Sequence, residues 1–267
     1  MKRYDIVYSV TAHESIECVY NLYENIMKFN SGLECAIIFH VNEFLNSQRY
    51  LVPISRGLFF NPIITEKSAF TKSIMLAHLD NYEYFRDIDF DLFCLLASNC
   101  MFICQVNYKL LEDTTPKLAD NVFEDKKDPS INFDKIEKEW FWPIYEKCLS
   151  LVELFRMNKI GAQARGHEGA YFRKDVFGSI YDFCMNNIVG KFDLPDGAGW
   201  EEIIIPSLES YFTGSLGTRY CKHFRFDREI SNDELIEFVN SSSPQNIVKR
   251  VERSMDSKVR RFINSNL

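Results

Sequence analysis

The stretch Tyr4-Asp-Ile-Val-Tyr-Ser-Val10 is rich in β-branched and aromatic residues and opens the part of the chain that decides the fold. Thr11–Ser15 then form a predicted turn and helix cap, and apolar residues recur at helical spacing over residues 16–27. Leu33–Val41 is an apolar run typical of a buried strand. Strand, helix and strand in this order form a βαβ unit, which predicts a parallel sheet.

The same patterns extend this unit along the rest of the chain. Further strands are predicted at Leu51–Ile54, Leu92–Leu96 and Ala170–Phe172. Helices are predicted over Ser68–Tyr84, Ile136–Met157, Lys174–Asn187, Glu201–Tyr211 and, as an amphipathic basic helix, Asn246–Asn264. Polar loops are predicted at Thr114–Asp134 and Leu194–Gly199. We therefore expect a single α/β domain over residues 1–267, with a mostly parallel sheet flanked by helices.

Composition excludes several classes of protein. The net charge of −7 argues against a nucleic-acid-binding protein, which usually carries a basic surface. The 8 cysteines form no C-x-x-C pair and most lie in apolar runs, as expected in a reducing compartment. The polar N-terminus predicts no signal peptide, and no apolar run reaches the length of a membrane span. We expect a cytoplasmic protein, or one on the cytosolic face of a membrane.

Candidate binding residues follow the predicted strands. Ligands of open α/β sheets bind at the carboxyl ends of the strands, where loops and helix N-termini meet. His13 and Glu14 follow the first strand, and Asn42 follows the second. Ser98 and Asn99 follow the strand at Leu92–Leu96. These residues are therefore predicted to line a common pocket.

The motif Asp87-x-Asp89-x-Asp91 is a candidate metal site, because divalent metals favour carboxylate ligands. It precedes its strand, however, and is expected at the opposite edge of the sheet, where a solvated turn accounts for it. After that strand the chain offers only Ser98 and Asn99, which are weak ligands for hard cations. The sequence therefore predicts a site without a metal.

A site that binds a phosphate without a metal needs basic side chains. Arg219 and Lys222 lie in one basic segment, and Lys249 and Arg250 lie in the predicted C-terminal helix. A solvated basic helix face explains the second pair equally well.

Acidic side chains that could act as a general base occur in two places. Glu201 and Glu202 follow Trp200 and precede an apolar run, although acids at a helix N-terminus also stabilise the helix dipole. Glu168 lies between Gly166 and Gly169, glycines that suggest a tight turn.

Five segments, taken in order, resemble one family. They are Ile6–His13, Ile38–Asn42, Asp91–Ile103, Gly169–Phe177 and Gly199–Leu208. The ordered set is similar to the core-2/I-branching N-acetylglucosaminyltransferases and peptide xylosyltransferases, including shorter bacterial and viral relatives. The resemblance implies a GT-A, Rossmann-like glycosyltransferase that inverts the anomeric centre, uses a UDP-sugar and works without a metal. Two departures, Asn42 and Cys100 in place of acids, leave the uridine and acceptor contacts open.

Carried over by position, the resemblance implies Glu202 as the general base, with Glu201 beside it. The family binds the diphosphate with basic residues of its C-terminal portion, which do not align residue by residue with this chain; the best candidates are Lys249 and Arg250, ahead of Arg219 and Lys222. The nucleotide would lie against His13, Glu14 and Asn42, and the sugars against Ser98, Asn99, Glu168, Trp200 and Glu201. Residues 1–110 would then form the nucleotide-binding half, and residues 111–267 the acceptor and catalytic half.

The expected partners are a UDP-sugar donor and a saccharide acceptor, with no nucleic acid and no transmembrane segment. A lipid-linked acceptor and a peripheral membrane contact are compatible with this expectation. Two alternatives stay open at this point: a non-catalytic carbohydrate-binding or assembly protein on the same fold, and a metal-dependent transferase that uses Asp89 or Asp91.

Overall fold

The predicted βαβ unit forms the centre of the molecule. The computed structural model describes residues 3–13, 15–64, 73–119, 148–194, 199–224, 228–241 and 243–267. In it, β1 (Tyr4–Ala12) is followed by α1 (Ile16–Phe29) and β2 (Cys35–Val41). The Ser15 hydroxyl accepts a hydrogen bond from the backbone N–H of Cys18, which satisfies a free donor at the start of α1.

The main sheet has the strand order β3-β2-β1-β4-β6. β3 (Leu58–Phe60) and β4 (Phe90–Ala97) run parallel to the central strands, whereas β6 (Ala170–Arg173) runs antiparallel to β4. The carboxyl ends of the parallel strands therefore share an edge with the amino end of β6. The mostly parallel α/β architecture predicted from the sequence is confirmed.

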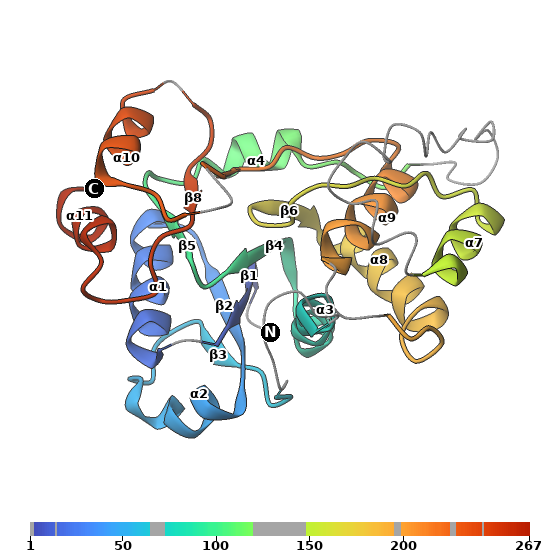
Figure 1. The fold of residues 1–267 in the computed structure, drawn as a ribbon, viewed down its shortest axis with the longest axis horizontal. Coiled ribbons are helices and arrows are strands. Elements are labelled where there is room, and N and C mark those ends of the chain that lie inside the picture. The colour runs from blue at the N-terminus through green and yellow to red at the C-terminus, as the bar shows by residue number, and fades with distance from the viewer. Residues whose placement is uncertain are drawn as a thin grey trace.

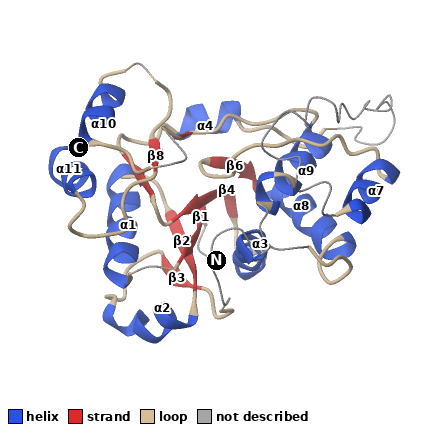
Figure 2. Ribbon diagram, viewed as in Figure 1, coloured by secondary structure: helices blue, strands red, loops and turns tan. Residues whose placement is uncertain are grey.

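Helices cover both faces of this sheet (Figures 1 and 2). Successive side chains of a strand point to opposite faces, so Val7 of β1 packs into one hydrophobic core and Tyr8 into the other. Side chains of four helices share the core with Val7: α3 (Ser73–Phe85), α7 (Leu149–Met157), α8 (Lys174–Asn187) and α9 (Ile204–Thr213). Side chains of α1, α10 (Asn232–Val239) and α11 (Lys258–Asn266) share the core with Tyr8.

A small second sheet corrects the prediction for the C-terminus. The order is β5-β8-β7, from β5 (Cys100–Phe102), β8 (Ile247–Lys249) and β7 (Cys221–Lys222). The basic helix predicted over Asn246–Asn264 is therefore wrong in its first half, and α11 begins only at Lys258. Ile247 and Val248 are fully buried β-branched residues, and pairing with two distant strands outweighs the helical spacing of the local sequence.

Other predicted boundaries shift. No strand forms over Leu51–Ile54: α2 (Glu43–Gln48) is followed by a 3₁₀ helix, Arg49–Leu51, and the third strand is β3. In place of one helix from Glu201, the structure has a 3₁₀ turn, η2 (Trp200–Glu202), followed by α9. A further helix, α4 (Tyr108–Thr114), was not predicted.

Four of the predicted elements lie partly outside the described residues: the helices Ser68–Tyr84 and Ile136–Met157, and the loops Thr114–Asp134 and Leu194–Gly199. Of the helix predicted over Ile136–Met157, only α7 (Leu149–Met157) falls within them, and most of the loop predicted over Thr114–Asp134 does not. Among the described helices, none combines the length and apolar character needed to cross a bilayer.

Candidate functional site

The candidate site lies where the carboxyl ends of β1 and β4 meet the amino end of β6. Gly169 precedes β6 and donates its backbone N–H to the carbonyl of Leu95 in β4, at 2.9 Å. Gly169 has a φ of +69°, and a Cβ atom there would lie 2.6 Å from the backbone nitrogen of Cys221. Only glycine fits this turn, and the turn places Glu168 at the edge of the sheet.

Glu168 is the anionic centre of the site. It is 2% exposed and forms an ion pair with Lys249, and His223 Nε2 lies 3.4 Å from its Oε2. Burial alone would raise the pKa of Glu168, but the neighbouring positive charges hold it well below its usual value. The cation that pairs with Glu168 is Lys249, the last residue of β8. Lys249 pairs with Cys100 of β5, and this pairing fixes its backbone next to the end of β4.

Glu201 and Glu202 form the second acidic part of the site, within η2. Burial, reinforced by the carboxylates of Glu202 and Glu168, raises the pKa of Glu201 to about 8. Burial also raises the pKa of Glu202 to about 7, against the opposing charges of Lys249 and Arg250. Both acids are therefore held in an apolar setting beside Lys249, and Glu202 is the more exposed, at 8% against 3%.

His167 joins the two acidic parts, and the sequence did not single it out. Its Nε2 lies 3.6 Å from Oε1 of Glu168, and its Nδ1 lies 3.9 Å from Oε1 of Glu201. It is 4% exposed, and neither ring nitrogen has a hydrogen-bond partner among the described residues. Burial lowers the pKa of His167 to about 4, so its ring is neutral near pH 7 and Lys249 is the cation that offsets Glu168.

A buried polar network supports His167 from beneath. The ring of His78, on α3, lies 5.3 Å from that of His167, measured between centroids. His78 Nδ1 lies 2.7 Å from the hydroxyl oxygen of Ser9, which also accepts a hydrogen bond from Asn81. The only sequence feature that could have indicated His167 is its place next to Glu168 between two glycines, and nothing in the sequence indicated His78.

Two residues that follow β1 and β2 and were predicted to bind the nucleotide, His13 and Asn42, contact each other. The Asn42 amide donates to the backbone carbonyl of His13 at 3.2 Å, and its oxygen caps α2 through Leu45 N–H. Asn42 thus ties the ends of the two strands together. Glu14 lies outside the described residues.

Ser98 and Asn99 follow β4 directly. Both are buried, and the Asn99 carbonyl accepts a hydrogen bond from the backbone of Val251. Their backbones are therefore held between the main sheet and the chain that leaves β8. Trp200 is completely buried and belongs to the hydrophobic core shared by α3, α8 and α9.

The four predicted basic residues separate into two groups. Lys249 lies beside Glu168, and the charge of Arg250 acts on Glu202. Arg219 instead lies 2.7 Å from a buried carboxylate oxygen of Glu209, and Lys222 places its ammonium over the ring of Phe224. Arg250 also has a φ of +74°, a left-handed conformation that costs about 1–2 kcal/mol for a residue other than glycine.

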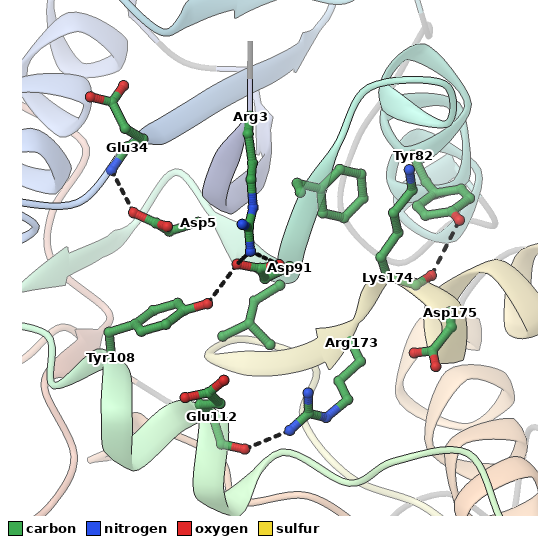
Figure 3. Close-up of a pocket in the computed structure, with 12 residues that line it drawn as sticks. Arg3, Asp5, Glu34, Tyr82, Asp91, Tyr108, Glu112, Arg173, Lys174 and Asp175 are labelled. Atoms are coloured by element: carbon green, nitrogen blue, oxygen red, sulfur yellow. Dashed lines mark hydrogen bonds and ion pairs between the residues drawn. The ribbon is translucent and has the colours of Figure 1, made fainter. Parts of the chain in front are cut away.

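The acids considered as metal ligands lie at the opposite edge of the sheet, as the sequence predicted. Figure 3 shows Asp91 at the amino end of β4, facing Arg3 and Tyr108. Arg3 donates to both Asp91 carboxylate oxygens at 2.8 Å, and the Tyr108 hydroxyl donates at 2.8 Å. This groove has a volume of about 740 Å³, and its chemistry is that of paired surface charges.

The site at the carboxyl edge thus offers acids in an apolar setting, an unpartnered imidazole and two cations. Such a set can accept a proton from a hydroxyl and stabilise an anionic leaving group. No protein-family model matches the chain, and no curated protein sequence is significantly similar to it.

Proposed function

We propose that this protein is an inverting glycosyltransferase that moves a sugar from a UDP-sugar to a saccharide hydroxyl. The observation that carries the proposal is the convergence of Glu202, Lys249 and Arg250 at the carboxyl edge of a mostly parallel sheet. Open α/β sheets bind nucleotides at this edge. The ordered resemblance to the core-2/I-branching family supports the same assignment.

Glu202 is the proposed general base. It accepts the proton of the acceptor hydroxyl, whose oxygen forms a bond to the anomeric carbon while the bond from that carbon to the UDP oxygen breaks. The electron pair of the broken bond leaves with UDP, opposite the attacking oxygen. Glu202 suits this role better than Glu201, because Glu201 is more deeply buried and faces His167.

Lys249 and Arg250 would stabilise the negative charge that develops on the diphosphate. Glu168 positions Lys249 through their ion pair, so the ammonium is fixed before the substrate binds. A metal ion is not needed for this reaction, and we expect transfer to persist in a strong chelator. Cytoplasmic location and a lipid-linked acceptor stay predictions.

The test compares Glu202→Gln with Glu112→Gln. Glu112 is an acid of the opposite groove, so its variant is a matched control for charge loss. A panel of UDP-sugars screened by thermal shift first identifies the donor. Transfer and slow donor hydrolysis are then measured.

We expect Glu202→Gln to lose about 100- to 10,000-fold in transfer rate, the usual contribution of a general base, with UDP affinity retained. Full activity of this variant would refute the base assignment. If the wild-type chain binds UDP-sugars but neither transfers nor hydrolyses them, the non-catalytic alternative is correct.

A further inference from the structure

The cluster at the carboxyl edge has a property that the proposed transfer reaction does not use. One ligand atom each from His167, Glu168 and Glu202 lies within 4.8 Å of the other two. In addition, His167 is 4% exposed and has no hydrogen-bond partner for either ring nitrogen among the described residues. A buried polar group without a partner costs free energy, so its persistence calls for a ligand.

From these two observations we propose that His167, Glu168 and Glu202 bind a transition-metal dication of the zinc type. The donor set decides the metal: imidazole with carboxylates suits Zn²⁺, whereas Mg²⁺ and Ca²⁺ prefer oxygen ligands alone. Three protein ligands also leave one tetrahedral position open for a solvent molecule or a substrate oxygen.

The distances fit this assignment after small side-chain rotations. Zinc bonds of about 2.1 Å in a tetrahedron separate the ligand atoms by about 3.4 Å. His167 Nε2 and Glu168 Oε1 are 3.6 Å apart, close to that value. Glu202 is the least buried of the three, and its carboxylate packs against Gly199, where any side chain would crowd it.

The neighbouring cation does not prevent binding. Lys249 contacts Oε1 of Glu168, the same oxygen that lies 3.6 Å from His167 Nε2, so its ammonium turns away when a metal binds there. The other oxygen, Oε2, lies 3.4 Å from Nε2 of His223, which is 21% exposed.

The metal site has a consequence that rests on the proposed function. An ion held by Glu202 occupies the proposed base, so Zn²⁺ would inhibit a transferase that itself works without a metal. Chelation would restore its activity. The binding site itself stands on geometry and does not depend on that reaction.

The test uses the full chain and Co²⁺ as a spectroscopic substitute for Zn²⁺, with Zn²⁺ affinity measured by competition against a chromophoric chelator. Cys104, the exposed cysteine, is replaced by serine in every variant, so that a thiolate site is not mistaken for the proposed one. We expect one ion per chain, with the visible Co²⁺ bands of a low-coordinate N/O site. His167→Ala and Glu202→Gln should each weaken binding more than about 100-fold, since loss of even an outer-shell partner costs up to that much.

Glu112→Gln, in the opposite groove, should bind normally. Absence of binding, or equal binding by all the variants, overturns the proposal. If His167→Ala does not fold, the metal affinity of Glu202→Gln alone tests the proposal, because glutamine keeps the shape of the glutamate side chain and the variant should fold. Binding by a chain that shows no transfer would refute the proposed function and leave the metal site intact.

Discussion

Replacing Arg219 by methionine leaves the carboxylate of Glu209 buried without its cation. Glu209 is 1% exposed, and its oxygens accept hydrogen bonds from Arg219 at 2.7 and 3.4 Å and from the Gly217 backbone N–H at 2.9 Å. In the variant the hydrogen bond from Gly217 remains, and among the described residues Arg165 is a further cation whose charge acts on Glu209. Removing one partner of a buried ion pair costs about 3–5 kcal/mol, because the other charge stays desolvated. At roughly 2–4 °C per kcal/mol, the melting temperature should fall by about 6–20 °C.

The measurement is urea unfolding of Arg219→Met, Glu209→Gln and the double variant. We expect the double variant to cost at least about 1 kcal/mol less than the sum of the single variants, because it leaves no unpaired charge. The matched control is the exposed pair Arg86–Asp182, 3.1 Å apart, where Arg86→Met should cost under about 1 kcal/mol.

The result also decides between two roles for Arg219. If Arg219 bound the diphosphate, Arg219→Met would lose UDP affinity and keep its stability. Additive losses in the cycle, or a cost below about 1 kcal/mol for Arg219→Met, would contradict the structural role argued from the Glu209 contact.

Three further predictions follow from particular backbone and charge contacts. Arg250→Gly should stabilise the fold by about 0.5 kcal/mol, since relief of a φ of +74° outweighs the entropic cost of glycine, and it should weaken UDP binding. Arg250→Ala should weaken UDP binding without the gain in stability. Lys222→Ala should keep both the stability and the UDP affinity, which urea unfolding and calorimetry measure in turn. Gly169→Ala should destabilise the protein by at least about 1–3 kcal/mol, because its Cβ would lie 2.6 Å from a backbone nitrogen, and an unchanged unfolding midpoint would disprove that contact. The hydrogen bond from Arg228 lowers the pKa of Glu234 to about 2. The stability that this carboxylate contributes is therefore present above its ordinary pKa of 4.5 and is lost as the pH falls towards 2. In Arg228→Ala, carboxyl NMR should show the pKa of Glu234 rising towards 4.5.

Local patterns carried the prediction furthest in the first half of the chain. The start of α1 after Thr11–Ser15 and the β-branched and aromatic character of β1 are properties of neighbouring residues, so the local sequence shows them directly. The same reasoning placed Asp91 at the far edge of the sheet, because a residue that precedes a parallel strand cannot lie at its carboxyl end.

The second half depended on partners that are distant in sequence. β8 is a three-residue strand held by β5 and β7, and strands this short show no period from which pairing can be predicted. Arg219 and Lys249 look equivalent in the sequence, since each is a cation in a basic segment. Their environments differ because Arg219 meets Glu209 on α9, whereas Lys249 meets Glu168, 81 positions away.

The sequence by itself determined the α/β class, the central βαβ unit and the edge of the sheet at which a ligand is predicted to bind, because these follow from local spacing and from the direction of parallel strands. Only the tertiary structure decided which charged residues share the site. The turn at Gly169 brings His167 and Glu168 to η2 and β8. Burial there lowers the pKa of His167, whereas electrostatic interactions with His167 and Lys249 lower the pKa of Glu168 against the effect of burial. Proximity between segments this far apart comes from packing of the whole chain, which no short stretch of sequence encodes.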